Sequence, residues 1–189
     1  MIIGDANQPR APARARLFLA LWPGTRERAS LLAYQQQCAW PRGSSPVKAE
    51  RLHLTLHFIG AVERSRGPEI AAGLQLPVAA AGTFDAFELS LTRAEIWPRG
   101  LAVLRAPEVP DALQQLHADL GKALRALHLP VESRPLRPHV TLARRAAASL
   151  LPKEPPSLRW PIDSYVLVES TLGAGGGYRL WRRYGCGDG

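Results

Sequence analysis

The chain has 189 residues, 24 lysine and arginine side chains against 16 acidic ones, and a formal net charge of +8. This length buries a core without covalent staples, and the two cysteines, Cys38 and Cys186, have no metal-ligand or redox spacing, so we expect free thiols and a cytoplasmic protein. No run approaches the roughly 20 apolar residues of a membrane span, and residues 1–15 lack the apolar centre of a signal peptide.

The N-terminal half is predicted to contain two strands and two helices. Residues 1–15, rich in proline and arginine, are expected to form a disordered tail. The apolar run at 16–22 is typical of a buried strand, and a helix capped by Thr25 is predicted to run to about Cys38. A strand around the first motif described below follows, and residues 68–76 indicate a second helix.

The C-terminal half is predicted to be richer in strands. Residues 84–97 follow a mostly alternating pattern and are interpreted as one half-buried strand, which turns at residues 98–100. A long helix is predicted from Asp111, because leucines in helical spacing make one apolar stripe. The remaining predicted strands lie at residues 101–104, 136–143, 162–169 and 178–184, with a proline-rich link at 152–161.

One four-residue pattern, His-x-Thr-Leu, occurs twice in predicted strands. It begins at His53 with Thr55, and again at His139 with Thr141. Side chains two apart on a strand point to the same face, so each copy offers an imidazole and a hydroxyl side by side. The copies lie about half the chain length apart, as expected if each half donates one pair to a shared groove.

The order of elements predicts an α+β fold with mainly antiparallel sheets rather than a doubly wound one. Together with the spacing of the two motifs, it predicts a bilobal, internally duplicated domain over residues 16–184, followed by a short tail at 185–189.

Two histidines facing each other across a groove can divide acid and base duties, because imidazole titrates near pH 6.5. The hydroxyls of Thr55 and Thr141 could donate to phosphate oxygens, which suits attack at phosphorus. No Asp, Glu or Cys lies at ligand spacing beside either histidine, so neither a metal nor a cofactor is expected. A single His-x-Thr is more often an ordinary strand sequence, and the duplication is what favours chemistry.

At these residues the chain resembles the two-histidine (2H) phosphoesterases, and within them the bacterial and archaeal RNA 2′,3′-cyclic phosphodiesterases, also called 2′-5′ RNA ligases. The resemblance rests on residues 16–23, 52–60, 137–144 and 167–172. It implies two sheets around a central basic groove with helices outside, and metal-free hydrolysis of a terminal 2′,3′-cyclic phosphate of RNA to a 2′-phosphate. It also implies that His53 and His139 are catalytic, with Thr55 and Thr141 as phosphate ligands.

Four further residues are candidates for binding substrate. Arg144 matches the family's phosphate-binding arginine, although strict alternation would turn it away from His139 unless a bulge or the strand end redirects it. Arg137 has the favourable parity and is the second choice, with a solvated charge as the alternative. His57 shares the predicted face of the first motif, and Phe58 could stack an RNA base or pack in the core.

The positive charge has two interpretations. It attracts a polyanion such as RNA, and all but three of the basic residues are arginines, whose guanidinium suits bidentate phosphate contacts. Arginine richness also follows from genome base composition. The charge therefore favours an RNA partner without establishing one.

The leading hypothesis is an RNA-end cyclic phosphodiesterase that works as a monomer, in which His139 activates water and His53 protonates the leaving 3′-oxygen. A weak reverse reaction would join RNA ends through 2′-5′ linkages. Two alternatives stay open. One is a non-catalytic RNA-binding module that keeps the groove and its charge. The other is a phosphodiesterase for a small cyclic nucleotide, which would need a smaller and less basic mouth.

Overall fold

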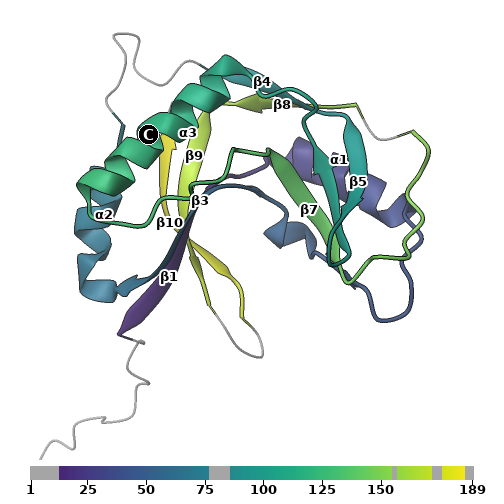
Figure 1. Ribbon diagram of the computed structural model, residues 1–189, viewed down its shortest axis with the longest axis horizontal. Helices are drawn as coiled ribbons and strands as arrows, with labels where there is room; N and C mark the ends of the chain where they lie inside the picture. The colour runs from purple at the N-terminus through teal and green to yellow at the C-terminus, as the bar shows by residue number, and fades with distance from the viewer. Residues whose placement is uncertain (1–12, 77–85, 155–156, 172–175, 186–189) are drawn as a thin grey trace, which may run out of the picture.

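The computed structural model of the chain describes residues 13–76, 86–154, 157–171 and 176–185. It is an α+β fold, as predicted, and every strand pairing within these residues is antiparallel (Figure 1). The helices are α1 (Thr25–Gln37), α2 (Gly67–Gly73) and α3 (Asp111–Ala126), with single 3-10 turns at Ala49–Arg51 and Arg64–Arg66. The strands are β1 (Arg14–Leu21), β2 (Ser45–Pro46), β3 (Leu54–Glu63), β4 (Phe87–Leu91), β5 (Arg93–Trp97), β6 (Leu101–Arg105), β7 (His139–Arg144), β8 (Leu158–Ile162), β9 (Ser164–Ser170) and β10 (Tyr178–Gly185).

The main sheet consists of two halves joined at one point. Its strand order is β10-β9-β1-β3-β7-β6-β5, with β2 on β7, while β4 and β8 form a separate pair. The two central strands, β3 and β7, are joined by a single residue pair, Leu54 opposite Val140. Beyond that pair the two halves diverge, which gives the molecule its two lobes (Figure 1).

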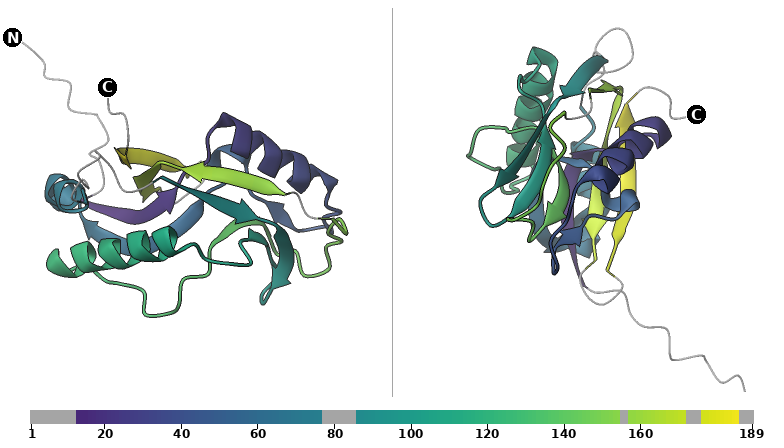
Figure 2. Two further views of the ribbon diagram at one scale, coloured as in Figure 1. Left: turned by 90° about the horizontal axis from the view of Figure 1, so that it is seen from above. Right: turned by 90° about the vertical axis from the view of Figure 1, so that its right-hand side faces the viewer.

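The two halves exchange their helices. Helix α1 follows β1 of the first half, yet Gln35 in α1 donates its side-chain amide to the carbonyls of Val47 and Leu142, at 2.8 and 2.7 Å, beside and within β7. Helix α3 follows β6 of the second half, yet His117 in α3 stacks on His57 in β3. The strand-helix-strand order β1-α1-β3 thus recurs as β6-α3-β7, and Figure 2 shows α1 and α3 at opposite ends of the long axis.

The main sheet buries apolar side chains on both faces, but unequally. In β1 the odd-numbered residues Leu17, Leu19 and Leu21 enter the large core beneath the helices, where each fully buried leucine contributes about 1.5–3 kcal/mol. The even-numbered Phe18 and Ala20 enter a small cluster on the opposite face. That second face carries the functional groove described below.

Two predicted boundaries are corrected. Strand β1 begins at Arg14, and Ala15 is almost fully buried opposite Val62, so the tail expected at 1–15 overlaps the strand. Gly185, assigned to the C-terminal tail, closes β10 opposite Ser164. The remainder of the expected tails, 1–12 and 186–189, lies outside the described residues.

The predicted strand at 84–97 is two strands in different sheets. Strand β4 pairs with β8, which was not predicted as a strand because residues 152–161 are rich in proline. Strand β5 pairs with β6, as the predicted hairpin. Alternation reports which face a side chain takes but not which strand is its partner. Pro161 is tolerated in β8 because, within the described residues, that strand pairs with β4 alone and so is an edge strand. Helix α1 begins where predicted, but its cap position is Gly24 and no side chain caps it.

The amide of Gln35 supplies a test of the helix exchange. Gln35→Leu should lower the free energy of unfolding by about 1–3 kcal/mol, because buried carbonyls on β7 and before β3 lose a donor. Urea unfolding measures the change. The matched control is Gln37→Leu, two residues along the same helix, whose exposed amide donates to the carbonyl of Ala33. Equal stability of the two variants would contradict the proposed bracing role of Gln35.

Candidate active site

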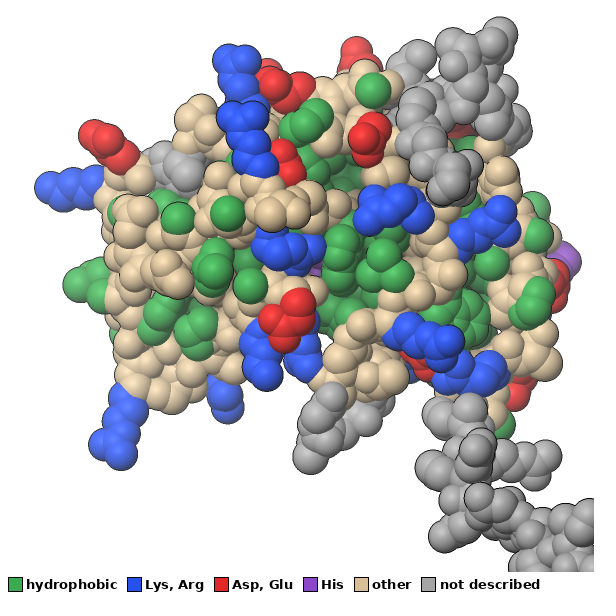
Figure 3. All heavy atoms as spheres, turned by 180° about the vertical axis from the view of Figure 1, so that it is seen from behind, with side chains coloured by type: hydrophobic (Ala, Val, Ile, Leu, Met, Phe, Trp, Pro, Cys, Tyr) green, Lys and Arg blue, Asp and Glu red, His purple; other side chains and the backbone are tan. Residues whose placement is uncertain are grey.

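A groove of about 610 Å³ lies on the face of the sheet opposite the main core. Four of its lining residues are cationic, and these are Arg16, Lys48, Arg51 and Arg144. Within the described part of the chain, none of the lining residues is acidic. Seen from behind, the molecule has its basic side chains interleaved with acidic and apolar ones (Figure 3). The groove is thus a positively charged site, and its field favours an anion.

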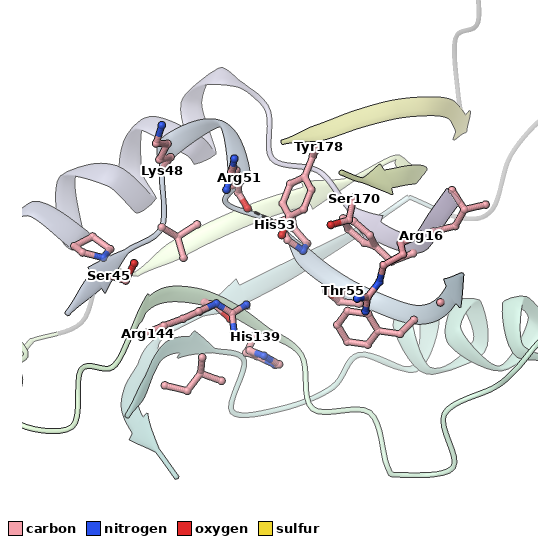
Figure 4. Close-up of a pocket in the computed structure, with 18 residues that line it drawn as sticks. Arg16, Ser45, Lys48, Arg51, His53, Thr55, His139, Arg144, Ser170 and Tyr178 are labelled. Carbon is pink, nitrogen blue, oxygen red and sulfur yellow. Dashed lines mark hydrogen bonds between the residues drawn. The ribbon is translucent and has the colours of Figure 1, made fainter. Parts of the chain in front are cut away.

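Both motif histidines line this groove from opposite sides (Figure 4). The backbone pair between Leu54 and Val140 is the cause, because these residues sit between the histidine and the threonine of each motif. Their side chains enter the core, so the flanking histidines and threonines face the groove. The antiparallel register carries His53 toward Thr141, and it carries Thr55 toward His139 in the same way. Both threonines also line the groove, as predicted.

The two imidazoles are held in the same tautomer. Nδ1 of His53 lies 2.6 Å from the carbonyl oxygen of Arg51, and Nδ1 of His139 lies 2.7 Å from that of Arg137. A carbonyl only accepts, so each Nδ1 carries the proton and donates it. Each neutral ring therefore presents the unprotonated Nε2 for proton transfer.

Burial and positive charge favour the neutral form of both imidazoles. The pKa of His53 is lowered to about 4, mainly by burial, with the charges of Arg144, His139 and Arg28 adding to the effect and the carbonyl of Arg51 opposing it. Burial also lowers the pKa of His139, with the charges of Arg137 and Arg144 acting in the same direction. An anion in the groove would oppose these charges and raise both pKa values.

A bulge in β7 directs Arg144 into the groove. The register between β6 and β7 shifts by one residue at Leu142, so the alternation reverses after Thr141, and Arg144 lines the groove beside His139 (Figure 4). The bulge therefore turns Arg144 toward the groove, as the sequence required if this residue was to lie near His139. The same shift occurs in β3 at Leu56 and turns Phe58, 63% exposed, into the groove. Arg144 and Phe58 occupy equivalent positions, each the fifth residue after its histidine.

His57 does not line the groove, contrary to the prediction. The bulge at Leu56 turns it to the other face, where it is 1% exposed. Its ring stacks on that of His117 at 3.9 Å between centroids, and its Nε2 lies 2.9 Å from the carbonyl oxygen of His117. Burial lowers the pKa of both rings, so this pair adds no charge to the core at neutral pH.

Arg137, the second phosphate-binding candidate, also lies outside the groove lining. Its guanidinium sits over the ring of Trp97, 4.1 Å from the centroid. Its carbonyl rather than its charge serves the site, by accepting the Nδ1 proton of His139.

Several groove residues were not predicted. Arg51 had a detectable signal, because it precedes His53 by two residues just as Arg137 precedes His139, so the repeated motif extends to Arg-x-His-x-Thr-Leu. Arg16 and Lys48 reach the groove from β1 and from the loop before β3, where neither carries a motif. Tyr178 from β10 stands edge-on to the ring of His53 at 5.2 Å.

Three further observations concern metal sites, membrane-spanning helices and the cysteines. In the described ranges, no group of three or more His, Cys, Asp or Glu side chains is placed to hold a metal ion. Among the same residues, no helix is long and apolar enough to cross a membrane. Cys38 is a buried free thiol whose pKa is raised to about 11 by burial, and Cys186 lies outside the described residues.

Comparison with known proteins gives one consistent result. Residues 34–173 match the 2′-5′ RNA ligase superfamily. The chain is 31% identical to an RNA 2′,3′-cyclic phosphodiesterase of Thermus thermophilus over 83% of this chain and 82% of that one. It is 32% identical to an RNA 2′,3′-cyclic phosphodiesterase of Escherichia coli over 89% and 92% of the two chains. The crystal structure of E. coli LigT in apo form superposes with a TM-score of 0.77 at 25% identity, covering 92% of this chain and 98% of that one.

The charge of the groove predicts a response to anions. Inorganic phosphate should raise the pKa of His53 by about one unit or more, since a bound anion offsets the surrounding cations. NMR titration of the histidine ring protons, with and without phosphate, measures the shift. The buried His57 and His117 serve as internal controls outside the groove, and Arg144→Ala should reduce the response. An unchanged His53 titration at saturating phosphate would show that the groove is not an anion site.

Proposed function

Since the chain belongs to the 2′-5′ RNA ligase superfamily, we propose that its two motif histidines hydrolyse a terminal 2′,3′-cyclic phosphate of RNA to a 2′-phosphate. Both relatives that are 31% and 32% identical over most of the chain are RNA 2′,3′-cyclic phosphodiesterases, so this chain is an enzyme of the same kind. The observation that carries the residue assignment is the pair of imidazoles with free Nε2 atoms in one cationic groove.

In the proposed reaction one imidazole takes a proton from water while the other gives a proton to the leaving 3′-oxygen. The P–O bond to the 3′-oxygen breaks as the P–O bond to water forms, and the phosphate remains on the 2′-oxygen. Rings of Phe18, Trp22 and Tyr178 surround His53, whereas among the described residues His139 contacts the ring of Trp97. We assign His139, the less enclosed imidazole, as the base that meets water, and His53 as the acid.

The phosphate is proposed to lie between the two threonines. Hydroxyls of Thr55 and Thr141 would donate to its non-bridging oxygens, and the Arg144 guanidinium would balance the charge that develops there. These groups are side chains of the protein, so no step requires a metal. Lys48 and Arg16 lie toward opposite ends of the groove, where they can meet backbone phosphates of a longer strand (Figure 4).

The same features bear on the two alternatives. A small cyclic nucleotide needs charge only near its own phosphate, whereas the cations here extend along a groove of about 610 Å³, which favours an RNA end. A non-catalytic RNA-binding module needs positive charge but has no use for two imidazoles fixed in one tautomer. We also propose that the protein works as a monomer in the cytoplasm. Weak 2′-5′ ligation would use the same proton transfers with the 5′-hydroxyl of a second RNA in place of water, so that the P–O bond to the 3′-oxygen breaks as the new 2′-5′ linkage forms.

Activity on a defined RNA end tests the proposal. The protein, with EDTA present, should convert an oligoribonucleotide 2′,3′-cyclic phosphate to the 2′-phosphate, and His53→Ala and His139→Ala should each lower kcat about 10²–10⁴-fold. Chromatography against both phosphate isomers identifies the product. His128→Ala, outside the groove lining, is the matched histidine control. Tight RNA binding without turnover by the unmutated chain would transfer the assignment to the binding module.

The assignment of acid and base is tested with a sulfur substrate. Replacing the 3′-oxygen of the cyclic phosphate by sulfur gives a thiolate leaving group that needs no protonation, so His53→Ala should lose far less activity on it than on the oxygen substrate. His139→Ala should lose about the same on both. The reverse pattern would exchange the two roles.

The lowered pKa values predict an acidic optimum. In the free enzyme the productive form has one neutral and one protonated imidazole, so kcat/KM peaks between the two pKa values, and both lie below 6.5. Above the higher of the two, the acid loses its proton and kcat/KM should fall about tenfold per pH unit. A pH profile of kcat/KM from 4 to 9 measures this. A maximum above pH 7 would contradict the prediction.

A further inference from the structure

Trp97, at the end of β5, contacts the residues on both sides of the hydrogen bond that fixes His139. Its ring lies 4.6 Å from the ring of His139, between centroids, and 4.1 Å from the Arg137 guanidinium carbon. Arg137 is the residue whose carbonyl accepts the Nδ1 proton of His139. One indole therefore contacts both the donor ring and the side chain of the acceptor residue.

The indole is itself held from behind. Its Nε1–H donates to the carboxylate of Glu95 at 2.8 Å, and Glu95 also accepts from Nε of Arg105 at 2.9 Å. The hydrogen bond from Trp97, and then those from Arg105, lower the pKa of Glu95, so the carboxylate is charged at neutral pH. Arg105 stands opposite His139 in the pairing of β6 with β7. The network therefore meets His139 of β7 at two points, through the ring of Trp97 and through the backbone pairing of Arg105.

The hairpin that carries Trp97 is fixed at its turn as well. The carbonyl of Gly100 accepts the backbone N–H of Ala146, just after β7, at 2.8 Å. Gly100 has a φ of +68°, and a Cβ there would lie 2.8 Å from the backbone nitrogens of Ala146 and Ala147. Only glycine combines this conformation with so close an approach. The hairpin is therefore held to the β7 segment at its turn, through Gly100, and at the end of β6, through Arg105, and Trp97 lies three residues before Gly100.

From this geometry we infer that Trp97 is a positioning residue for His139, and that Arg137 acts through its stack on Trp97 rather than as a phosphate ligand. The stack fixes the direction of the Arg137 carbonyl, and that carbonyl fixes the tautomer and orientation of His139. His53 has no equivalent single brace, because three aromatic rings surround it. This inference rests on the proposed function for its kinetic consequence, but its structural content does not depend on turnover.

Two variants of Trp97 separate positioning from mere packing. Trp97→Ala should lower kcat about 10–100-fold and change KM less than about threefold, because the base is misaligned while the phosphate site is intact. Trp97→Phe keeps a ring face for Arg137 and His139 and should stay within about threefold of the unmutated kcat. A KM rise with unchanged kcat in Trp97→Ala would overturn the proposal, since it would make Trp97 a substrate contact.

Trp181 offers a matched control. Its ring also lies under an arginine, Arg64 at 5.8 Å, and its Nε1–H donates to a glutamate, Glu169 at 2.9 Å, but it lies outside the groove lining. Trp181→Ala should lower stability without the kcat loss. An equal kcat loss in Trp181→Ala and Trp97→Ala would assign the effect to general destabilisation and overturn the proposal.

Nitrogen NMR of His139 without substrate separates this proposal from the proposed function. The charged and titratable groups facing His139 are Arg137, Arg144 and His53, with Glu95 and Arg105 behind Trp97. In Trp97→Ala the imidazole of His139 becomes more exposed to solvent, so the pKa of His139 should rise toward the ordinary 6.5. The tautomer of His139 that carries the proton on Nδ1 should lose population. An unchanged pKa and tautomer would overturn the positioning role, even in a fully active enzyme. The expected shifts in a chain that cleaves no cyclic phosphate would overturn the proposed function alone.

Arg137→Ala tests the second half of the inference. Loss of the stack should lower kcat and leave both KM and its dependence on salt nearly unchanged. A phosphate ligand behaves differently, because its removal raises KM and reduces the salt dependence by about one counterion. That second pattern would restore Arg137 as a phosphate contact.

Discussion

The backbone pair between Leu54 and Val140 places the histidine and the threonine of both motifs in one groove. It is the single pairing between β3 and β7, and it lies between the histidine and the threonine of both motifs. Because the two side chains enter the core, the chemical side chains on either side of them must face the groove. The exchanged helices support this junction from behind, α1 through Gln35 on β7 and α3 through His117 on β3.

The groove brings positively charged side chains close together. Four cations line it without an acidic lining residue in the described part of the chain, so they repel one another when no ligand is bound. Burial, together with the charge of Arg144, lowers the pKa of both motif histidines and so favours the neutral imidazoles. In the proposed reaction, a bound phosphodiester would offset these charges and favour the protonated form of one histidine.

Strand parity predicted much of the site and failed where the strands are irregular. It placed His53, Thr55, His139 and Thr141 on one surface, because these residues precede the bulges. It failed for His57, since the extra residue at Leu56 reverses the alternation, and a bulge leaves no clear mark in a run of apolar residues. Arg144 was predicted only because a resemblance to known proteins required the bulge that parity could not see.

The fold class could also be predicted, but strand partners could not. Element order was enough to indicate antiparallel α+β, whereas the split of residues 84–97 between two sheets depends on contacts with β8, far along the chain. The position of Arg137 could not be predicted for a similar reason. Its parity was favourable, but the ring that captures its guanidinium belongs to a different hairpin.

The exchange of helices has a consequence for how the chain reaches its native state. Gln35 and Leu142, which are joined by a hydrogen bond, lie 107 positions apart. During synthesis α1 therefore emerges from the ribosome long before β7, the strand that it packs against. In the same way, β3 emerges well before α3, the helix that packs on it. Neither lobe can act as an independent folding unit, so we expect slow folding in which both lobes form together, late, after β7 is available.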